Sequence, residues 1–260
     1  MRFRSSKGKL IIGAVIVLFA VFKYFSNTDE NEFTGKKQHI SMSVEEEIAI
    51  GLQSAPTMAQ QHGGLYPDKN FQAFVDQIGQ RLVKNTIAED TPYKYDFHLL
   101  KDAETVNAFA LPGGQIFITY ALFSKLENED QLAGVLAHEI VHVFGRHSAE
   151  RMAKQGLTQG ILSGVAVGFD PSTAQGAAAI ANVLNLKYGR EDELESDGLG
   201  VKLMVDAGYN PNALIDVMKI LEEAAGPNRV PERMSTHPDP GNRIEEIKEA
   251  IELYSKSKTQ

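Results

Sequence analysis

His138 and His142 stand four residues apart in the sequence His-Glu-Ile-Val-His, and Glu139 directly follows the first of them. In a helix, residues four apart lie on one face, so both imidazoles can bind the same metal ion. Glu139 leaves the helix about 100° further round, where its carboxylate can reach a water molecule on that metal without being a ligand. The spacing predicts a hydrolytic zinc site in which His138 and His142 are metal ligands and Glu139 is the catalytic base.

The residues around this motif favour a buried helix over about residues 130–146. They are mostly apolar: Leu132, Val135, Leu136, Ile140, Val141, Val143 and Phe144. Burying two histidines and a glutamate without partners costs free energy, and a divalent metal ion would supply the partner. A chance match to the pattern is more typical of an exposed segment.

A catalytic zinc ion needs a third protein ligand and leaves its fourth position to water. His147 is one candidate, and Gly145 before it fits the metzincin pattern. That pattern requires the third histidine one position later, where the chain has Ser148. The spacing therefore excludes His147 as a metzincin-type ligand.

The acidic segment from residue 191 to residue 197 offers a better candidate at the start of a later helix. Glu193 and Asp197 are four apart, so they share one face of that helix. This permits Glu193 as the third metal ligand and Asp197 as a hydrogen-bond acceptor that orients a ligating imidazole. We expect the other acidic residues of the segment to be solvated, namely Glu191, Asp192 and Glu195.

Taken together, His138-Glu139-x-x-His142 and Glu193-x-x-x-Asp197 resemble the motifs of the CAAX-prenyl-protease-like zinc metallopeptidases. This gluzincin family has HtpX-like, BepA-like and LoiP-like members. The segments Asn107–Gly114 and Ser235–Arg243 also resemble that family. The similarity extends over about residues 43–250.

The resemblance implies one zinc ion per chain, with Glu193 as its third ligand and Asp197 as a neighbouring aspartate. It places His237 near the metal, either as a fourth ligand in a resting state or as a contact to the reacting carbonyl. The oxyanion formed during peptide hydrolysis needs a donor besides the metal. His237 is our first candidate for that donor and Arg243 the second.

The pattern of the whole chain predicts a mostly α-helical α+β fold, the HExxH zinc-metallopeptidase fold, with a small antiparallel sheet beside the catalytic helix. Helices are predicted after the caps Ser43 and Asp68. Strands are predicted at residues 95–100, 106–110 and 115–119.

An edge strand beside a zinc helix can hold an extended peptide by backbone pairing. We expect the peptide to lie along Gln115–Ile118. The predicted substrate-binding residues are Asn107, Ala108, Gly114, Gln115, Ile116 and Arg243. The alternative is a sheet that only packs against the helix.

Residues 1–25 predict a membrane anchor. They carry five basic side chains and no acidic one, and residues 10–22 are uniformly apolar. That stretch is short for a span of about 17–25 residues and also matches a signal peptide. Lys23 beside aromatic residues, with no small-residue cleavage site after it, favours an anchor over a cleaved signal segment. The basic end predicts a bacterial inner-membrane protein with its catalytic domain in the periplasm, or in the alternative a protein secreted to the periplasm.

We expect a polar linker at residues 26–42 and a zinc metallopeptidase domain at residues 43–256. The chain has no cysteine, which excludes disulfides and thiolate metal sites. Its formal net charge of −8 argues against nucleic acid as a partner.

Glycine recurs every fourth residue from Gly156 to Gly168, which lets helices approach closely. We expect packing against Ala174–Leu186, and the alternative is a lipid-facing hairpin. HtpX-like enzymes have membrane helices around the catalytic helix. The corresponding residues 157–186 are short and rich in glycine and alanine, which predicts a soluble catalytic domain.

These features predict a zinc-dependent endopeptidase that cleaves unfolded or misassembled proteins in envelope quality control, with polypeptides as substrates. A peptide that is bound to a strand mainly through backbone hydrogen bonds is selected with little sequence specificity. Such binding suits unfolded substrates of varied sequence. The alternative is a chaperone-like binding protein whose zinc site is closed by His237 and cleaves little.

Overall fold

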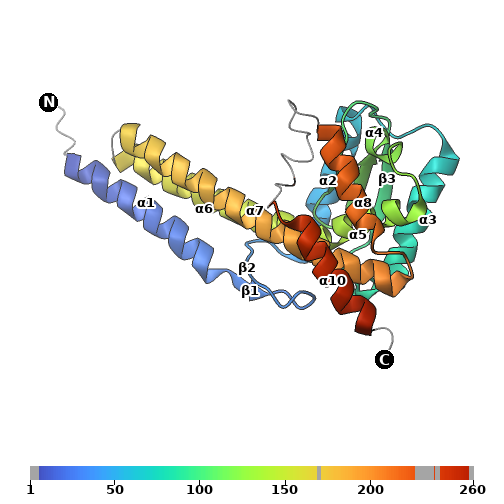
Figure 1. The fold of residues 1–260 in the computed structure, drawn as a ribbon. Coiled ribbons are helices and arrows are strands. Elements are labelled where there is room, and N and C mark those ends of the chain that lie inside the picture. Colours follow the sequence, from blue (N-terminus) through green and yellow to red (C-terminus); the bar gives the residue numbers. More distant parts are fainter. Residues whose placement is uncertain (1–5, 169–170, 226–236, 238–240, 258–260) are drawn as a thin grey trace. The chain divides into compact units, whose positions relative to one another are not determined.

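The computed structural model describes residues 6–168, 171–225, 237 and 241–257, and among these the side chains of residues 168–188 lie outside the description. The chain divides into two compact units. One comprises residues 1–42 and 148–189, and the other comprises residues 43–147 and 190–260. The elements are labelled in Figure 1, and each unit is described by itself.

The larger unit contains a three-stranded sheet in the order β3-β5-β4. The strands are β3 (Asp96–Leu100), β4 (Ala108–Ala110) and β5 (Gln115–Thr119). β4 pairs with β5 in the antiparallel sense, whereas β3 pairs with β5 in parallel. The mostly helical α+β fold is confirmed, but the expectation of a wholly antiparallel sheet is wrong. The chain reverses direction at each connection and β5 inserts between β3 and β4, so β3 and β5 run the same way.

This strand order changes which backbone a peptide could pair with. β5 is the central strand, so its backbone groups are bonded to β3 on one side and to β4 on the other. The expectation that a peptide pairs along Gln115–Ile118 is therefore wrong. In the described part of the chain, β4 is the edge strand that follows the Asn107 motif.

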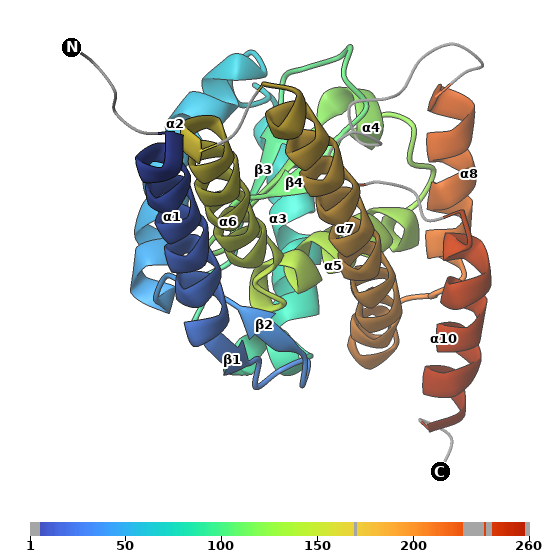
Figure 2. The ribbon, with the colours of Figure 1, turned by 90° about the vertical axis from the view of Figure 1, so that its left-hand side faces the viewer.

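Helices in this unit begin where the sequence places their caps. α2 (Val44–Gln61) starts with a capping box in which Ser43 accepts a hydrogen bond from the backbone of Glu46. α3 (Lys69–Lys84) starts after Asp68, whose side chain accepts from the backbone of Asn70. A 3₁₀ helix, η1 (Ile87–Asp90), follows α3. α3 packs against β3 and against α5 (Glu129–Phe144). Figure 2 shows α3 next to the strands of the sheet.

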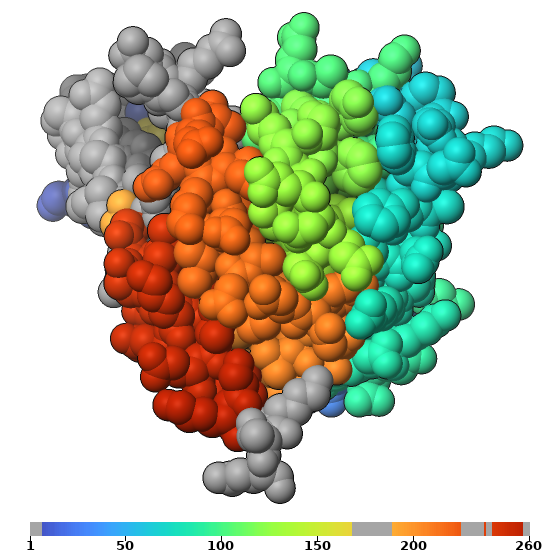
Figure 3. All heavy atoms as spheres, turned by 45° about the vertical axis from the view of Figure 1, so that its right-hand side comes forward, coloured from blue at the N-terminus to red at the C-terminus, as the bar shows by residue number. Residues whose placement is uncertain are grey.

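α5 is the helix that carries the two predicted histidine ligands. Every residue from Gln131 to Phe144 is buried, which confirms the prediction of a buried helix. α5 contacts β4 on one side and α8 (Ala213–Ala225) on another, and α10 (Arg243–Ser257) packs on α8. In Figure 3 α10 (red) lies beside α8 (orange), and the segment with α4 (Tyr120–Phe123) lies between α8 and α3.

The connection between β3 and β4 is ordered by Asp102. Its carboxylate accepts hydrogen bonds from the backbone N–H groups of Glu104 and Thr105 and lies 2.9 Å from His62 Nδ1. Burial alone would raise the pKa of Asp102, but the hydrogen bonds from Thr105, His62 and Glu104 lower it to about 2. The carboxylate therefore stabilises the fold fully above its unfolded pKa of about 3.9, and this contribution is lost as the pH falls towards the folded pKa.

We expect Asp102→Asn to lower the free energy of unfolding by about 1–2 kcal/mol at pH 7. The difference from the wild type should shrink by about half at pH 3, because the unfolded carboxyl is then mostly protonated. Denaturant unfolding of the full chain in detergent at both pH values measures this. If the wild type and Asp102→Asn differed in unfolding free energy as much at pH 3 as at pH 7, the lowered pKa of Asp102 would not be the cause of the difference.

The smaller unit contains α1 (Ser6–Ser26), which is long and apolar enough to cross a membrane by length and composition. It continues past the apolar core predicted from the sequence, and most of that helix is exposed. Within residues 26–42, predicted to be a polar linker, β1 (Thr28–Glu30) and β2 (Lys37–His39) form an antiparallel pair.

The repeated glycines lie on α6 (His147–Gly168), and two of them face α1. A Cβ added to Gly160 would lie 2.4 Å from the Cβ of Ala20, and one added to Gly164 would lie 2.6 Å from the carbonyl oxygen of Gly13. The repeat therefore permits close packing against α1. The side chains of the predicted partner, Ala174–Leu186 in α7 (Pro171–Ala207), lie outside the description.

Candidate metal centre

Three side chains that the sequence predicts as metal ligands meet in the larger unit. His138 and His142 come from α5 and Glu193 from α7. The two histidine Nε2 atoms are 3.0 Å apart, and the Glu193 oxygens lie 3.3 Å from that of His138 and 3.4 Å from that of His142. Tetrahedral zinc with bonds of about 2.0–2.1 Å holds its ligand atoms about 3.3 Å apart. The donor set therefore has both the chemistry and the spacing of a zinc site.

Hydrogen bonds on the far side of each imidazole indicate where the protons lie. His138 Nδ1 is 2.9 Å from Asp197 Oδ1, and His142 Nδ1 is 2.8 Å from His147 Nδ1. Asp197 as a carboxylate can only accept, so His138 carries its proton on Nδ1 and directs a lone pair from Nε2 towards the centre. A cation between the two Nε2 lone pairs makes their close approach favourable.

The surroundings shift the pKa values of the two imidazoles in opposite directions. Burial lowers the pKa of His138, but the carboxylates of Asp197 and Glu193 raise it above its ordinary value overall. Burial also lowers the pKa of His142 to about 3, although Glu193 opposes this. His142 is therefore neutral at physiological pH, the form in which an imidazole binds metal.

Asp197 is held by Arg243, at the start of α10. Arg243 Nε lies 2.6 Å from Asp197 Oδ2 and Nη2 lies 2.7 Å from Oδ1, while Nη1 is 3.4 Å from Glu193. Burial would raise the pKa of Asp197, but the charge of Arg243 and the hydrogen bonds from Arg243 and His138 hold it below its ordinary value. The predicted substrate-binding or oxyanion role of Arg243 is not what this geometry supports, because the guanidinium is buried against two carboxylates.

The pKa of Glu193 is lowered, as that of Asp197 is, by positively charged and hydrogen-bonding neighbours. Burial would raise its pKa, but the charge of His237 and hydrogen bonds from the three histidines lower it well below its ordinary value. It is therefore ionised and able to bind a metal. Gly200, two turns further along α7, lies against α5, since a Cβ there would be 3.4 Å from the backbone nitrogen of His138.

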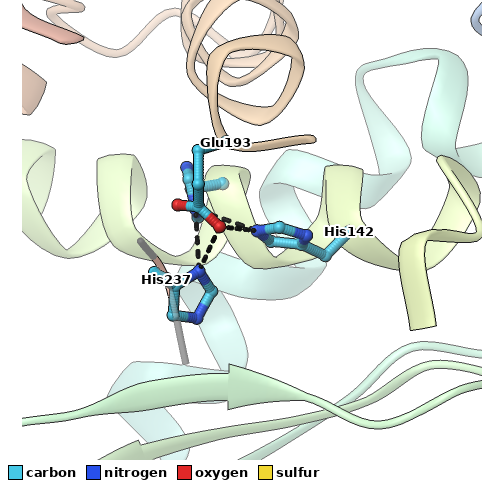
Figure 4. Close-up of side chains that lie close together, drawn as sticks. His142, Glu193 and His237 are labelled. Carbon is cyan, nitrogen blue, oxygen red and sulfur yellow. Dashed lines mark hydrogen bonds and ion pairs between the residues drawn. The ribbon is translucent and has the colours of Figure 1, made fainter. Parts of the chain in front are cut away.

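Glu139 and His237 complete the centre. Glu139 is fully buried beside the ligands, and its Oε1 lies 3.7 Å from His237 Nε2. His237 Nδ1 lies 2.9 Å from Glu193 Oε1 and 3.5 Å from His138 Nε2. Figure 4 shows the Glu193 carboxylate between the rings of His142 and His237. His237 can thus serve as a fourth ligand, while its other nitrogen faces the Glu139 carboxylate.

Apart from Arg243, the predicted substrate-binding residues lie in or beside the sheet. The Gln115 side-chain oxygen accepts a hydrogen bond of 2.9 Å from His98 Nε2, and Ile116 is fully buried in the central strand. Gly114 has φ +111°, and a Cβ there would lie 2.5 Å from the carbonyl oxygen of Lys94. These three residues build the sheet. Asn107 directly precedes the edge strand β4, Ala108 begins it, and both residues are buried.

Two parts of the centre were not predicted. Asp192 and Glu195 were expected to be solvated, yet Asp192 is 2% exposed and Glu195 lies 2.8 Å from His147 Nε2. His147, excluded as a ligand by spacing, instead contacts the far side of His142. His147 is not on the same helix as His142, because α5 ends before Arg146, which has φ 55°. The contact between the two histidines therefore does not follow from helical spacing. Only the fold brings them together.

The family model described as Peptidase family M48 matches residues 70–251. The chain is 28% identical over 249 residues to the mitochondrial metalloendopeptidase OMA1 of Schizosaccharomyces pombe, covering 95% of this chain and 73% of that protein. It is 33% identical over 183 residues to the beta-barrel assembly-enhancing protease of Escherichia coli K12, covering 66% of this chain. The chain spans 37% of that protein and 46% of the Yersinia pestis one.

Proposed function

This chain belongs to peptidase family M48 and is a zinc metalloendopeptidase, and on that premise we propose that it hydrolyses peptide bonds in unfolded or misassembled proteins of the cell envelope. The observation that carries the proposal is the buried centre of His138, His142 and Glu193 with Glu139 beside it. A purely structural zinc site does not need a general base.

His138, His142 and Glu193 would hold the zinc ion, and Glu139 would move the proton. Zinc, when bound, polarises the scissile carbonyl and lowers the pKa of a water towards about 7. Glu139 accepts a proton from the attacking water as the new C–O bond forms, and it delivers this proton to the leaving amine when the C–N bond then breaks. His237 donates a hydrogen bond to the developing oxyanion.

The substrate would enter as an extended segment. β4 has one side paired with β5, and α5 packs near it, so its outer edge is the place for a backbone-paired peptide. Main-chain pairing selects segments that are extended rather than a particular sequence. Folded proteins do not offer such segments, which supports a role in quality control.

The anchor and the compartment are part of the same proposal. α1 serves as a single-pass anchor, its basic residues stay in the cytoplasm, and the metallopeptidase domain of residues 43–256 works in the periplasm. A cleaved signal segment that releases the protein to the periplasm is the alternative. The relatives named for β-barrel assembly are bacterial, which supports an envelope location.

The test uses the full chain purified in detergent. One protein is offered as substrate in its native form and after irreversible unfolding, and cleavage products are counted over time. We expect cleavage of the unfolded form, loss of activity with a chelator, and recovery on adding zinc. Equal cleavage of both forms would contradict selection of unfolded segments.

A second candidate function rests on the position of His237. With His237 Nδ1 among the ligand atoms, the centre can hold zinc with four protein ligands and no open position. Such a site binds metal and cleaves little, and the protein would then act by holding unfolded chains.

If His237 closes the site as a fourth ligand, His237→Ala should weaken zinc binding and raise the basal cleavage rate, because it opens the fourth position. Zinc affinity by chelator competition and cleavage of the unfolded substrate measure both effects, with His98→Ala as a histidine control in the sheet. A lower cleavage rate with zinc retained would instead assign His237 to the oxyanion.

A further inference from the structure

His147 and Glu195 form a hydrogen-bonded pair behind His142. His147 Nδ1 lies 2.8 Å from His142 Nδ1, and His147 Nε2 lies 2.8 Å from Glu195 Oε2. His147 is 1% exposed and the Glu195 side chain is 16% exposed. Both imidazole nitrogens of a buried histidine are therefore used, and one of them contacts a predicted metal ligand.

Metal binding allows one arrangement of protons along this chain of groups. If His142 binds metal through Nε2, its proton must be on Nδ1, and that N–H donates to His147 Nδ1. His147 then carries its own proton on Nε2, which donates to the Glu195 carboxylate. His142 donates to His147, His147 donates to Glu195 and the carboxylate only accepts, so the contacts and the metal-binding tautomer agree.

We propose that His147 and Glu195 are positioning residues that hold His142 in the tautomer and ring orientation needed to bind zinc. The proposal rests on His142 as a zinc ligand in the proposed function. On the other ligand, Asp197 holds His138 directly and Arg243 holds Asp197. The two histidine ligands are thus supported differently, one by a carboxylate and the other through an interposed neutral imidazole.

A second metal site is the competing interpretation. Ligand atoms of His147, Asp192 and Glu195 lie within 4.8 Å of one another, as a small metal cluster would require. His147 has no lone pair to offer there, however, because Nδ1 accepts from His142 and the proton on Nε2 points to Glu195. Binding a metal at this cluster would remove the support of His142.

The contribution of His147 and Glu195 to zinc binding can be measured on the full chain in detergent. The two readouts are the zinc affinity and the visible spectrum of the cobalt-substituted protein. We expect His147→Leu to weaken zinc binding about 10–100-fold and to change the cobalt spectrum, since outer hydrogen-bond partners of metal ligands have effects of this size. His147→Asn keeps an acceptor for the His142 N–H and should recover most of the affinity. Glu195→Ala should give a smaller loss than His147→Leu.

Glu191→Gln is the matched control, because Glu191 is exposed in the same acidic segment and should leave both readouts unchanged. Wild-type zinc affinity and cobalt spectrum in both His147→Leu and Glu195→Ala would overturn the proposal. Loss of a second metal equivalent in Glu195→Ala would overturn it in favour of the separate metal cluster. Since neither readout needs substrate, the result stands apart from whether the protein cleaves unfolded chains.

Discussion

Glu139→Gln is expected to lower the rate of peptide hydrolysis by about 10²–10⁴-fold while zinc remains bound. Glutamine has the shape of glutamate but cannot accept the proton of the attacking water. Glu139 is fully buried, lies outside the set of residues whose ligand atoms converge, and has its carboxylate 3.7 Å from His237. The loss should therefore appear in kcat, with the zinc content of the protein unchanged.

Cleavage of an unfolded protein by the wild type and the variant, each with its zinc content measured, tests this expectation. Glu129→Gln is the matched control, because Glu129 is exposed in the first turn of the same helix. If Glu139→Gln retained most of its activity, Glu139 would not be the base. If it lost its zinc, Glu139 would be needed for metal binding instead.

Arg243→Ala is expected to lower the free energy of unfolding by about 3–5 kcal/mol, the usual cost of breaking a buried ion pair from one side. Arg243 makes two hydrogen bonds to Asp197, whose side chain is fully buried. Removing the guanidinium leaves that carboxylate without its main counter-charge. Because Asp197 also accepts from His138, zinc affinity should fall by about 10–100-fold as well.

Denaturant unfolding and chelator competition on the full chain measure the two effects. Arg190→Ala is the control, since Arg190 is exposed at the start of the same acidic segment. A double variant with Asp197→Asn and Arg243→Ala should be less destabilised than the sum of the two single variants, because neither partner of the Arg243–Asp197 ion pair is left buried without the other. Unchanged stability with a higher KM in Arg243→Ala would instead restore its role as a substrate contact.

The sequence by itself determined the features that depend on neighbours along one element. Two histidines four apart, a glutamate and an aspartate four apart, and the capping box at Ser43 all follow from the pitch of a helix. These predictions could name a metal-binding donor set because each pair lies on one helix face, whichever way the helices pack. The apolar segment of α1 could likewise be predicted from composition alone.

Only the tertiary structure decided the relations between elements. The strand order places β5 in the centre, although the three strands follow one another in the sequence as a simple antiparallel sheet would. Arg243 reaches Asp197 from α10, and His147 reaches His142 only because Arg146 turns the chain in a left-handed conformation. Such contacts join residues with no periodic relation, so no local pattern encodes them. Buried charges and imidazoles instead find the partners that the packing brings within hydrogen-bond distance.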